Sequence, residues 1–311
     1  MFAVTAPAVD NAATETIGVL YLNPLLQELI DHLDLERLET NLFRGESRDI
    51  GSLRVFGGQV LGQALMAACA TVEGRSAHSL HAYFLRPGDF NAPIVYEVER
   101  NRDGRSFSSR RVVAIQHGRH IFTLAASFQV PEDGVEHQST MPVVPDPEGL
   151  KDIEDYAAGE KDNLPEKLRR YLWSRKPFSC RPVQPINYLA PQQREPRKQI
   201  WFKAVDTLPD DPNLHLGLMA YVSDYDLLTT STLPHGLAFM QGNVQMASLD
   251  HAMWFHRPFR LDQWLLYDCD SPVAVGARGL SRGSVYTREG ILVASVAQEG
   301  LIRVWDGRKP E

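Results

Sequence analysis

Asp224 is a carboxylate at the end of an apolar stretch, residues 217–223, that is predicted to lie in a core-facing helix. A carboxylate in such surroundings is unfavourable unless it is hydrogen-bonded or paired. It can also serve as the general base of a reaction. The residue alone leaves both interpretations open: a polar group accommodated in the core, or a catalytic base.

Gly57 and Gly58 begin another predicted helix, in which Val60, Leu61 and Ala64 form part of an apolar stripe. Free N–H groups and the helix dipole favour negative charge at such an end. They could bind a phosphate, or the carbonyl oxygen of a group undergoing acyl transfer. Plain helix initiation with tight packing explains the glycines equally well.

Arg105 and Arg111 belong to a basic cluster in a predicted strand, together with Ser106 and Arg110. Arginines of this kind can bind the phosphates of an anionic ligand. Alternating arginines also solvate the exposed face of a strand. Phosphate contact and simple surface exposure are equally open interpretations.

Residues 279–283 read Gly-Leu-Ser-Arg-Gly, which matches the G-x-S-x-G motif of serine hydrolases. That motif works on a sharp turn from a strand into a helix, which exposes the serine. Here residues 284–286 continue as a strand, and a hairpin follows. We therefore interpret Ser281 as a serine on a glycine-containing strand and not as a nucleophile.

The histidines and cysteines give no pattern typical of metal ligands. His251 and His256 lie five residues apart, and His78 and His81 lie three apart. Residues at odd separations point to opposite faces of a strand, so neither pair converges on one ion. The three cysteines are far apart and form no C-x-x-C pair. We predict no metal site and no cofactor.

These residues belong to a chain of 311 residues, which is about two domains at ~150 residues each. The formal net charge of −7 argues against a nucleic-acid binder. No apolar run approaches the ~20 residues that span a bilayer, and the N-terminus shows no signal-peptide pattern. We expect a cytoplasmic protein without stable membrane association.

A tandem repeat organises the chain. Residues 83–87 (Tyr-Phe-Leu-Arg-Pro) recur as 254–258 (Trp-Phe-His-Arg-Pro), an offset of 171. The same offset relates Tyr96 to Tyr267 and also one pair of arginines. Three coincidences in one register indicate a duplicated unit.

Each unit is predicted to be a helix followed by strands, because a stripe of helical period precedes segments rich in Val, Ile, Phe and Tyr. The predicted helices begin at residue 57 and near residue 216, the second running to 226. The predicted strands are 79–86, 93–101, 105–116 and 120–129, then 243–256, 263–269, 274–286 and 291–298. One helix against a long antiparallel sheet in each unit predicts an α+β fold.

Ten of the 20 prolines lie between Pro131 and Pro196, which is typical of a connecting segment. We predict an N-terminal unit over residues 1–135, a connector over 136–175 and a C-terminal unit over 176–311.

Several strings resemble the type II acyl-CoA thioesterases. They are residues 56–64 (FGGQVLGQA), 78–89 (HSLHAYFLRPGD), 103–107 (DGRSF), 221–224 (YVSD), 249–258 (LDHAMWFHRP) and 293–300 (VASVAQEG). The resemblance runs from about Leu25 to Arg303. It implies a double hotdog fold, in which two units, each a helix wrapped by an antiparallel sheet, form one continuous sheet.

The resemblance implies hydrolysis of fatty acyl-CoA to free fatty acid and CoA, without a metal or a covalent intermediate. A water-orienting trio of aspartate, threonine and glutamine carries over to Asp224, Ser248 and Gln298. Ser248 keeps the hydroxyl of the family's threonine but loses the β-branch that stiffens χ1. The resemblance also suggests that Gly57 and Gly58 polarise the thioester oxygen, and that the chain associates into a homo-oligomer.

Two other functions remain open at this stage. Hotdog enoyl-CoA hydratases use an aspartate and a histidine in a G-D-x-N-P-x-H type string, of which residues 88–93 match only part and lack the histidine. A non-catalytic acyl-CoA-binding protein would keep the fold and lose catalytic groups. Only Ser248 favours that second alternative.

Overall fold

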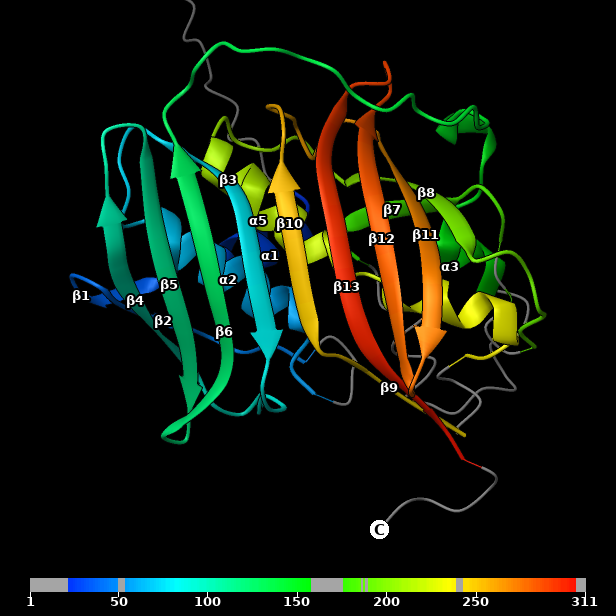
Figure 1. Ribbon diagram of the computed structural model, residues 1–311, viewed down its shortest axis with the longest axis horizontal. Helices are drawn as coiled ribbons and strands as arrows, with labels where there is room; N and C mark the ends of the chain where they lie inside the picture. The colour runs from blue at the N-terminus through cyan, green and yellow to red at the C-terminus, as the bar shows by residue number, and fades with distance from the viewer. Residues whose placement is uncertain are drawn as a thin grey trace, which may run out of the picture.

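The chain forms one large antiparallel sheet with its main helices on one face (Figure 1). The computed structural model describes residues 22–49, 54–157, 176–185, 187, 190–238 and 243–305. The order of the strands is β1-β2-β4-β5-β6-β3-β10-β13-β12-β11-β8-β7, and β9 pairs with β13 at one end. The α+β architecture predicted from the sequence is confirmed. Figure 1 shows α1, α2 and α5 behind the sheet.

The elements have the following bounds. The helices are α1 (Pro24–Leu33), α2 (Gly57–Cys69), η1 (Pro147–Gly149), α3 (Ile153–Ala157), α5 (Pro212–Ser223) and η3 (Leu228–His235). The strands are β1 (Glu36–Glu39), β2 (Leu42–Gly45), β3 (Ser76–Phe84), β4 (Ile94–Asp103), β5 (Phe107–Gln116), β6 (Arg119–Gln129), β7 (Phe178–Pro182), β8 (Arg197–Ala204), β9 (Val244–Ser248), β10 (Asp250–Phe255), β11 (Leu265–Val275), β12 (Arg278–Thr287) and β13 (Leu292–Val304).

The two repeated units meet in the middle of the sheet, where β3 pairs with β10. In this antiparallel pair Ala252 lies opposite His81, and the repeat offset of 171 relates the same two residues. A pseudo-twofold axis therefore passes between them. The duplicated unit is visible in the register, and this pairing makes one continuous sheet from two units. The domain boundaries stay predictions, since residues 158–175 lie outside the described ranges.

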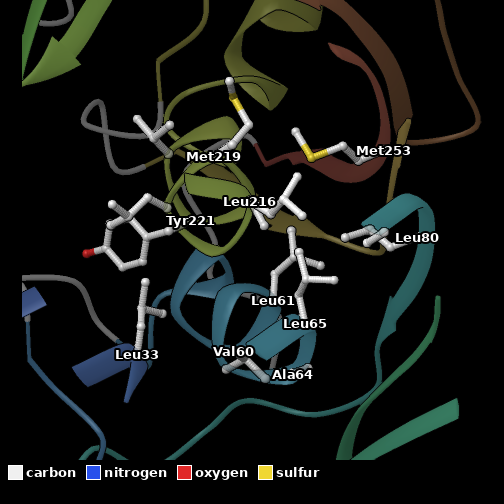
Figure 2. Packing of buried hydrophobic residues seen from close by; sticks show 14 of the residues in the cluster. Leu33, Val60, Leu61, Ala64, Leu65, Leu80, Leu216, Met219, Tyr221 and Met253 are labelled. Carbon is white, nitrogen blue, oxygen red and sulfur yellow. The ribbon is translucent and has the colours of Figure 1, made fainter. Parts of the chain in front are cut away.

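Helices α2 and α5 form the centre of the core (Figure 2). Leu61 and Leu65 on α2 lie beside Leu216 on α5, and all three side chains are buried. Burial of this apolar surface stabilises the fold by roughly 25 cal/mol per Å². The close approach of α2 and α5 places the N-terminus of α2 beside the C-terminus of α5.

The helix predicted over residues 216–226 begins earlier and ends earlier than expected. Asp211 caps its N-terminus by accepting a hydrogen bond from the Asn213 N–H, and Pro212 takes the first position, which suits a residue without an N–H. The helix ends at Ser223, and Asp226 has a left-handed φ of 61°. Asp224 is therefore the C-cap of α5 and does not lie within the helix.

The strand predicted over residues 243–256 is divided in two. Leu249 separates β9 from β10, and only β10 pairs with β3. Strand β9 pairs instead with the far end of β13. Strands β7 and β8, which the sequence analysis did not predict, extend the sheet beyond β11.

The G-x-S-x-G string lies within β12, and Ser281 is fully buried. A Cβ at Gly279 would lie 2.4 Å from Ser231 Oγ, and a Cβ at Gly283 would lie 2.1 Å from the ring of Tyr267. The glycines therefore permit close packing on the strand. The prediction that Ser281 lies on a strand, and not on a sharp turn into a helix, is confirmed. That Ser281 is no nucleophile stays a prediction.

Candidate active site

Asp224 lies where the two central helices meet. It is the C-cap of α5, and the backbone N–H of Gly58, at the start of α2, donates to its carboxylate. The dipole of α2 is positive at this end and favours a negative charge there. The side chain of Asp224 is 6% exposed. The start of α2, which was predicted to favour negative charge, thus lies beside the carboxylate of Asp224 from the C-terminal half of the chain.

Gln298 connects Asp224 to a hydrogen-bonded row of side chains. Its Nε2 donates to Asp224 Oδ1 at 2.6 Å and to His251 Nδ1 at 3.1 Å. On the other side of the ring, His251 Nε2 lies 3.0 Å from Ser223 Oγ, and that hydroxyl donates to the Ala220 carbonyl at 3.0 Å. Both N–H groups of the Gln298 amide thus have an acceptor, so the row fixes the orientation of this amide.

The buried position of the site changes its acid–base properties. Burial raises the pKa of Asp224 to about 6, while hydrogen bonds from Gln298 and Gly58 act in the opposite direction. Burial lowers the pKa of His251 to about 3, so the ring is neutral at physiological pH. Asp224 is thus ionised near neutral pH and is a stronger base than an exposed aspartate.

The activity of the protein is expected to depend on the ionisation of Asp224. If the carboxylate is the base, kcat/KM should rise tenfold per pH unit below about pH 6 and level off above it, following the raised pKa of Asp224. His251 adds no step between pH 5 and 8, since burial lowers its pKa to about 3. The measurement is a pH profile of kcat/KM between pH 4.5 and 9. An acid limb centred near pH 4 would contradict the assignment.

The two carboxylate oxygens of Asp224 have different surroundings. Oδ1 is held by Gln298. Oδ2 lies beside Gly57, where an added Cβ would be 2.7 Å from Oδ2 and 3.0 Å from the ring of Phe84. The absent side chain of Gly57 leaves this oxygen room for a small molecule. Asp224, Gln298, Gly57 and Gly58, all predicted from the sequence, are therefore brought together.

Comparisons with known proteins show the family of the chain. A family model described as "Acyl-CoA thioesterase" matches residues 174–301, and one described as "Acyl-CoA thioesterase N-terminal domain" matches residues 44–129. "Acyl-CoA thioesterase 2" of Haemophilus influenzae is 43% identical over 283 residues, which are 91% of this chain and 99% of that protein. The chain belongs to the type II acyl-CoA thioesterase family. Human "Acyl-coenzyme A thioesterase 8" is 44% identical over 282 residues, covering 88% of each chain.

Solved structures agree with the fold of this thioesterase. The acyl-CoA thioesterase II TesB2 from Mycobacterium marinum matches with a TM-score of 0.73 at 43% identity, covering 91% of this chain and 100% of that chain. A hot dog fold protein of unknown function from Alicyclobacillus acidocaldarius, 18% identical, matches with a TM-score of 0.72 over 89% of this chain and 98% of its own. The double hotdog fold is confirmed, and the protein is a thioester hydrolase.

Ser248, the third predicted member of the trio, lies on the same face of the sheet as Gln298. It ends β9 opposite Gly300, which is two residues from Gln298 on β13. Residues two apart on a strand share a face, and such diagonal neighbours are about 7–8 Å apart between Cα atoms. Ser248 makes no hydrogen bond to Asp224 or Gln298, although the structure describes all three side chains.

Arg105 and Arg111 are not brought to Asp224 by this thioesterase fold. Both are exposed, and Arg111 Nη1 donates to Glu99 Oε1 at 2.9 Å. Strand β5, which carries Arg111, is separated from β10 by β6 and β3. The neighbouring Arg110 is buried and bonds to Asp103. Contact of Arg105 and Arg111 with phosphates stays a prediction.

The partial hydratase string lies on the surface. Asp89 Oδ2 is 3.0 Å from His117 Nε2, but the two side chains are 42% and 64% exposed. An exposed pair lacks the desolvated surroundings that acid–base catalysis on a bound substrate uses. Nothing in this geometry favours the hydratase over the thioesterase.

Three supporting residues were missed as parts of the site: His251, Ser223 and Tyr267. Tyr267 Oη donates to the Ser223 carbonyl at 3.0 Å, which holds the end of α5. A sequence signal existed for His251, because it alternates with Met253 and Phe255 on one face of its strand and is the polar member of that face.

In the part of the chain that is described, no three His, Cys, Asp or Glu side chains cluster as a metal site would need. Within the same ranges, no helix is long and apolar enough to cross a membrane.

Proposed function

We propose that this thioesterase hydrolyses fatty acyl-CoA to free fatty acid and CoA by direct attack of a water held by Asp224, Ser248 and Gln298. The observation that carries the proposal is the 2.6 Å hydrogen bond from Gln298 Nε2 to Asp224 Oδ1, which fixes a buried carboxylate. The relatives are named as acyl-CoA thioesterases, which supports acyl-CoA as the substrate. We propose no metal and no cofactor.

The reaction needs one base and no covalent intermediate. The water transfers a proton to Asp224 Oδ2 while its oxygen attacks the carbonyl carbon of the thioester. The tetrahedral intermediate then loses the thiolate as the carbon–sulfur bond breaks, and the thiolate takes the proton back from Asp224. A positioned base contributes roughly 10²–10⁴-fold to such a step.

The start of α2 is our candidate for binding the thioester oxygen. The first N–H groups of a helix have no partner within the helix. The Gly58 N–H donates to Asp224, so it is not free for substrate. This leaves the N–H of Gly57, the residue whose added Cβ would adjoin Asp224 Oδ2, as the donor to the oxygen on which charge develops.

Release of free thiol tests the proposed function. Purified protein is incubated with palmitoyl-CoA and a thiol reagent, and with an enoyl-CoA whose hydration is followed separately. Thiol release at a rate proportional to enzyme concentration supports the thioesterase. Addition of water to the enoyl-CoA double bond supports a hydratase, and binding of palmitoyl-CoA without turnover supports a binding protein. Both outcomes would contradict the proposal.

Ser248 is expected to act through its hydroxyl. Ser248→Thr restores the family's residue and should keep kcat or raise it less than about fivefold, because freezing one rotor contributes under ~1 kcal/mol. Ser248→Ala should lower kcat by roughly five- to 150-fold, since the proposed water would lose a hydrogen-bond partner at about 1–3 kcal/mol. The measurement is thioester hydrolysis by the three proteins. Equal rates for Ala and Ser would show that Ser248 takes no part.

Homo-oligomerisation and a cytoplasmic location complete the proposal. Neither is tested by the geometry of one chain, and both stay predictions.

A further inference from the structure

The chain turns sharply just after Asp224. Asp226 has a left-handed φ of 61°, a conformation that a residue other than glycine adopts only at an energetic cost. The turn joins the end of α5 to η3, which begins at Leu228. Backbone of this kind persists only where the surrounding structure holds it. The contacts of Asp226 therefore help to fix the place of Asp224, two residues earlier in the chain.

Lys198 on β8 holds this turn from the sheet. Its side chain is 3% exposed, and its Nζ donates to the carbonyl oxygen of Asp226, to Asp226 Oδ2 at 2.8 Å and to Thr229 Oγ1 at 2.7 Å. An ammonium group has three N–H donors, and each of them has an acceptor here. Thr229 Oγ1 in turn donates to the same Asp226 carbonyl at 2.7 Å. One buried cation thus binds the backbone of the turn, its carboxylate and the start of η3.

A second contact from the sheet holds the chain on the other side of Asp224. Tyr267 Oη on β11 donates to the carbonyl oxygen of Ser223 at 3.0 Å. Strand β8, which carries Lys198, is a hydrogen-bonded neighbour of β11. The residue before Asp224 and the residue two positions after it are thus both held by side chains from adjacent strands. The backbone of Asp224 is fixed between these two points.

The ion pair of Lys198 with Asp226 is explained better by position than by stability. A buried ion pair contributes little net stability compared with apolar residues of similar volume, because both groups lose their hydration. An apolar side chain could fill the volume of Lys198, but it could not bind a carbonyl oxygen and a carboxylate at once. The charge therefore acts on the place of the turn.

We propose that Lys198 is a positioning residue for thioester hydrolysis, which fixes the turn at Asp226 and thereby keeps the Asp224 carboxylate at Gln298 Nε2. The hydrogen bond between these last two groups is 2.6 Å long and depends on the place of the Asp224 backbone. Misplacement of a reacting group by about 1 Å can lower a rate about 100-fold. Lys198 acts through Asp224 and not on the thioester itself. Its effect on catalysis therefore rests on the proposed function, in which Asp224 is the base.

Lys198→Met tests the positioning role, because methionine fills a similar volume without a charge. We expect kcat about tenfold lower, with KM within about twofold of the wild-type value, measured as thiol release from palmitoyl-CoA. Lys203→Met is the matched control: Lys203 lies at an odd separation along β8, so it points to the opposite face, where its Nζ is 5.1 Å from the ring centroid of Trp264. The control should keep both constants. A folded Lys198→Met protein with the wild-type kcat would overturn the proposal.

Asp226→Gly introduced into the Lys198→Met protein tests whether the turn is what Lys198 supplies. Glycine adopts a φ of 61° without strain, and its introduction leaves no carboxylate facing the methionine. This double variant is therefore expected to fold even where Lys198→Met alone does not. Its kcat should return to within about threefold of the wild-type value. A folded double variant with a kcat still about tenfold below wild type would refute the role of the turn.

A third comparison shows whether Lys198 acts through the carboxylate of Asp224. Lys198→Met introduced into Asp224→Asn should lower kcat by less than about twofold further, because the base whose position matters is already absent. A further loss of about tenfold would contradict the proposal. The proposed function fails by different results: Asp224→Asn alone keeps the wild-type kcat, or the wild-type protein releases no thiol.

Discussion

Asp224→Asn is expected to lower kcat by roughly 10²–10⁴-fold while KM changes little. The substitution keeps the shape of the side chain and removes its capacity to take a proton from water. Gln298 Nε2 can still donate to the amide oxygen that replaces Asp224 Oδ1. The loss should therefore fall on the chemical step. The measurement is steady-state hydrolysis of palmitoyl-CoA.

A matched control distinguishes the loss of the Asp224 carboxylate from the loss of a hydrogen-bonded carboxylate elsewhere in the protein. Asp31 on α1 also accepts a hydrogen bond from a glutamine amide, Gln27 Nε2 at 2.7 Å, but the pair is exposed. Asp31→Asn should hydrolyse palmitoyl-CoA at the wild-type rate. Turnover by Asp224→Asn within about threefold of wild type would show that the base lies elsewhere.

Asp224→Asn is expected to lower kcat but to raise the stability of the folded protein at neutral pH. Burial raises the pKa of Asp224 to about 6, above its value in the unfolded chain, so the folded state holds the proton more tightly. Relative to the variant, the wild-type protein should lose stability as the pH rises from about 4 to about 6, and the difference should stay constant above that. Thermal unfolding of both proteins at several pH values measures this difference. A difference independent of pH would mean that Asp224 is not buried in solution.

Patterns within one element were sufficient to predict much of the fold. The apolar stripe predicted α2, and the alternating residues predicted β3 to β6 within a few positions at each end. The repeat offset of 171 anticipated two equivalent units, and the pairing of Ala252 with His81 shows how they join. These features depend on the local period of apolar residues, which can be recognised from neighbouring positions in the sequence.

Features that depend on contacts between distant segments were not predictable in the same way. The division at Leu249 and the pairing of β9 with β13 have no local signal. The sequence placed Asp224 within a helix, whereas the turn at Asp226 makes it a cap. Lys198, a buried residue on β8, donates to Asp226 Oδ2 at 2.8 Å, and this distant ion pair holds that turn.

In the candidate site, too, individual residues were predictable from the sequence, whereas contacts between distant segments were not. Asp224 was singled out by its apolar surroundings and Gln298 by the resemblance, and the structure places them in one hydrogen-bonded row. The supporting contacts of His251 and Ser223 require the three-dimensional arrangement of β10 and α5. The G-x-S-x-G string was correctly predicted to lie on a strand, but its position opposite Gln298 depends on strand register.

Gly57 and Gly58 are adjacent, yet their alanine variants are expected to fail in different ways. A Cβ at Gly57 would lie 2.7 Å from Asp224 Oδ2, in the space where the water and thioester are proposed to bind. A Cβ at Gly58 would lie 2.2 Å from the Tyr221 carbonyl oxygen and 2.4 Å from the Phe56 ring. The first collision is with a side chain of the site, and the second is with the backbone of α5.

Gly57→Ala should therefore lower kcat by about 10- to 100-fold and leave the melting temperature nearly unchanged, since the gain in helix propensity of up to ~1 kcal/mol offsets the crowding. Gly58→Ala forces α2 and α5 apart and should destabilise the protein by about 2–3 kcal/mol, roughly 3–5 °C in Tm. Gly149→Ala is the control, because nothing lies within 4 Å of an added Cβ there. Differential scanning calorimetry and palmitoyl-CoA hydrolysis on the three variants measure both effects. If Gly57→Ala keeps full activity, the space beside Asp224 Oδ2 is not where the thioester is attacked.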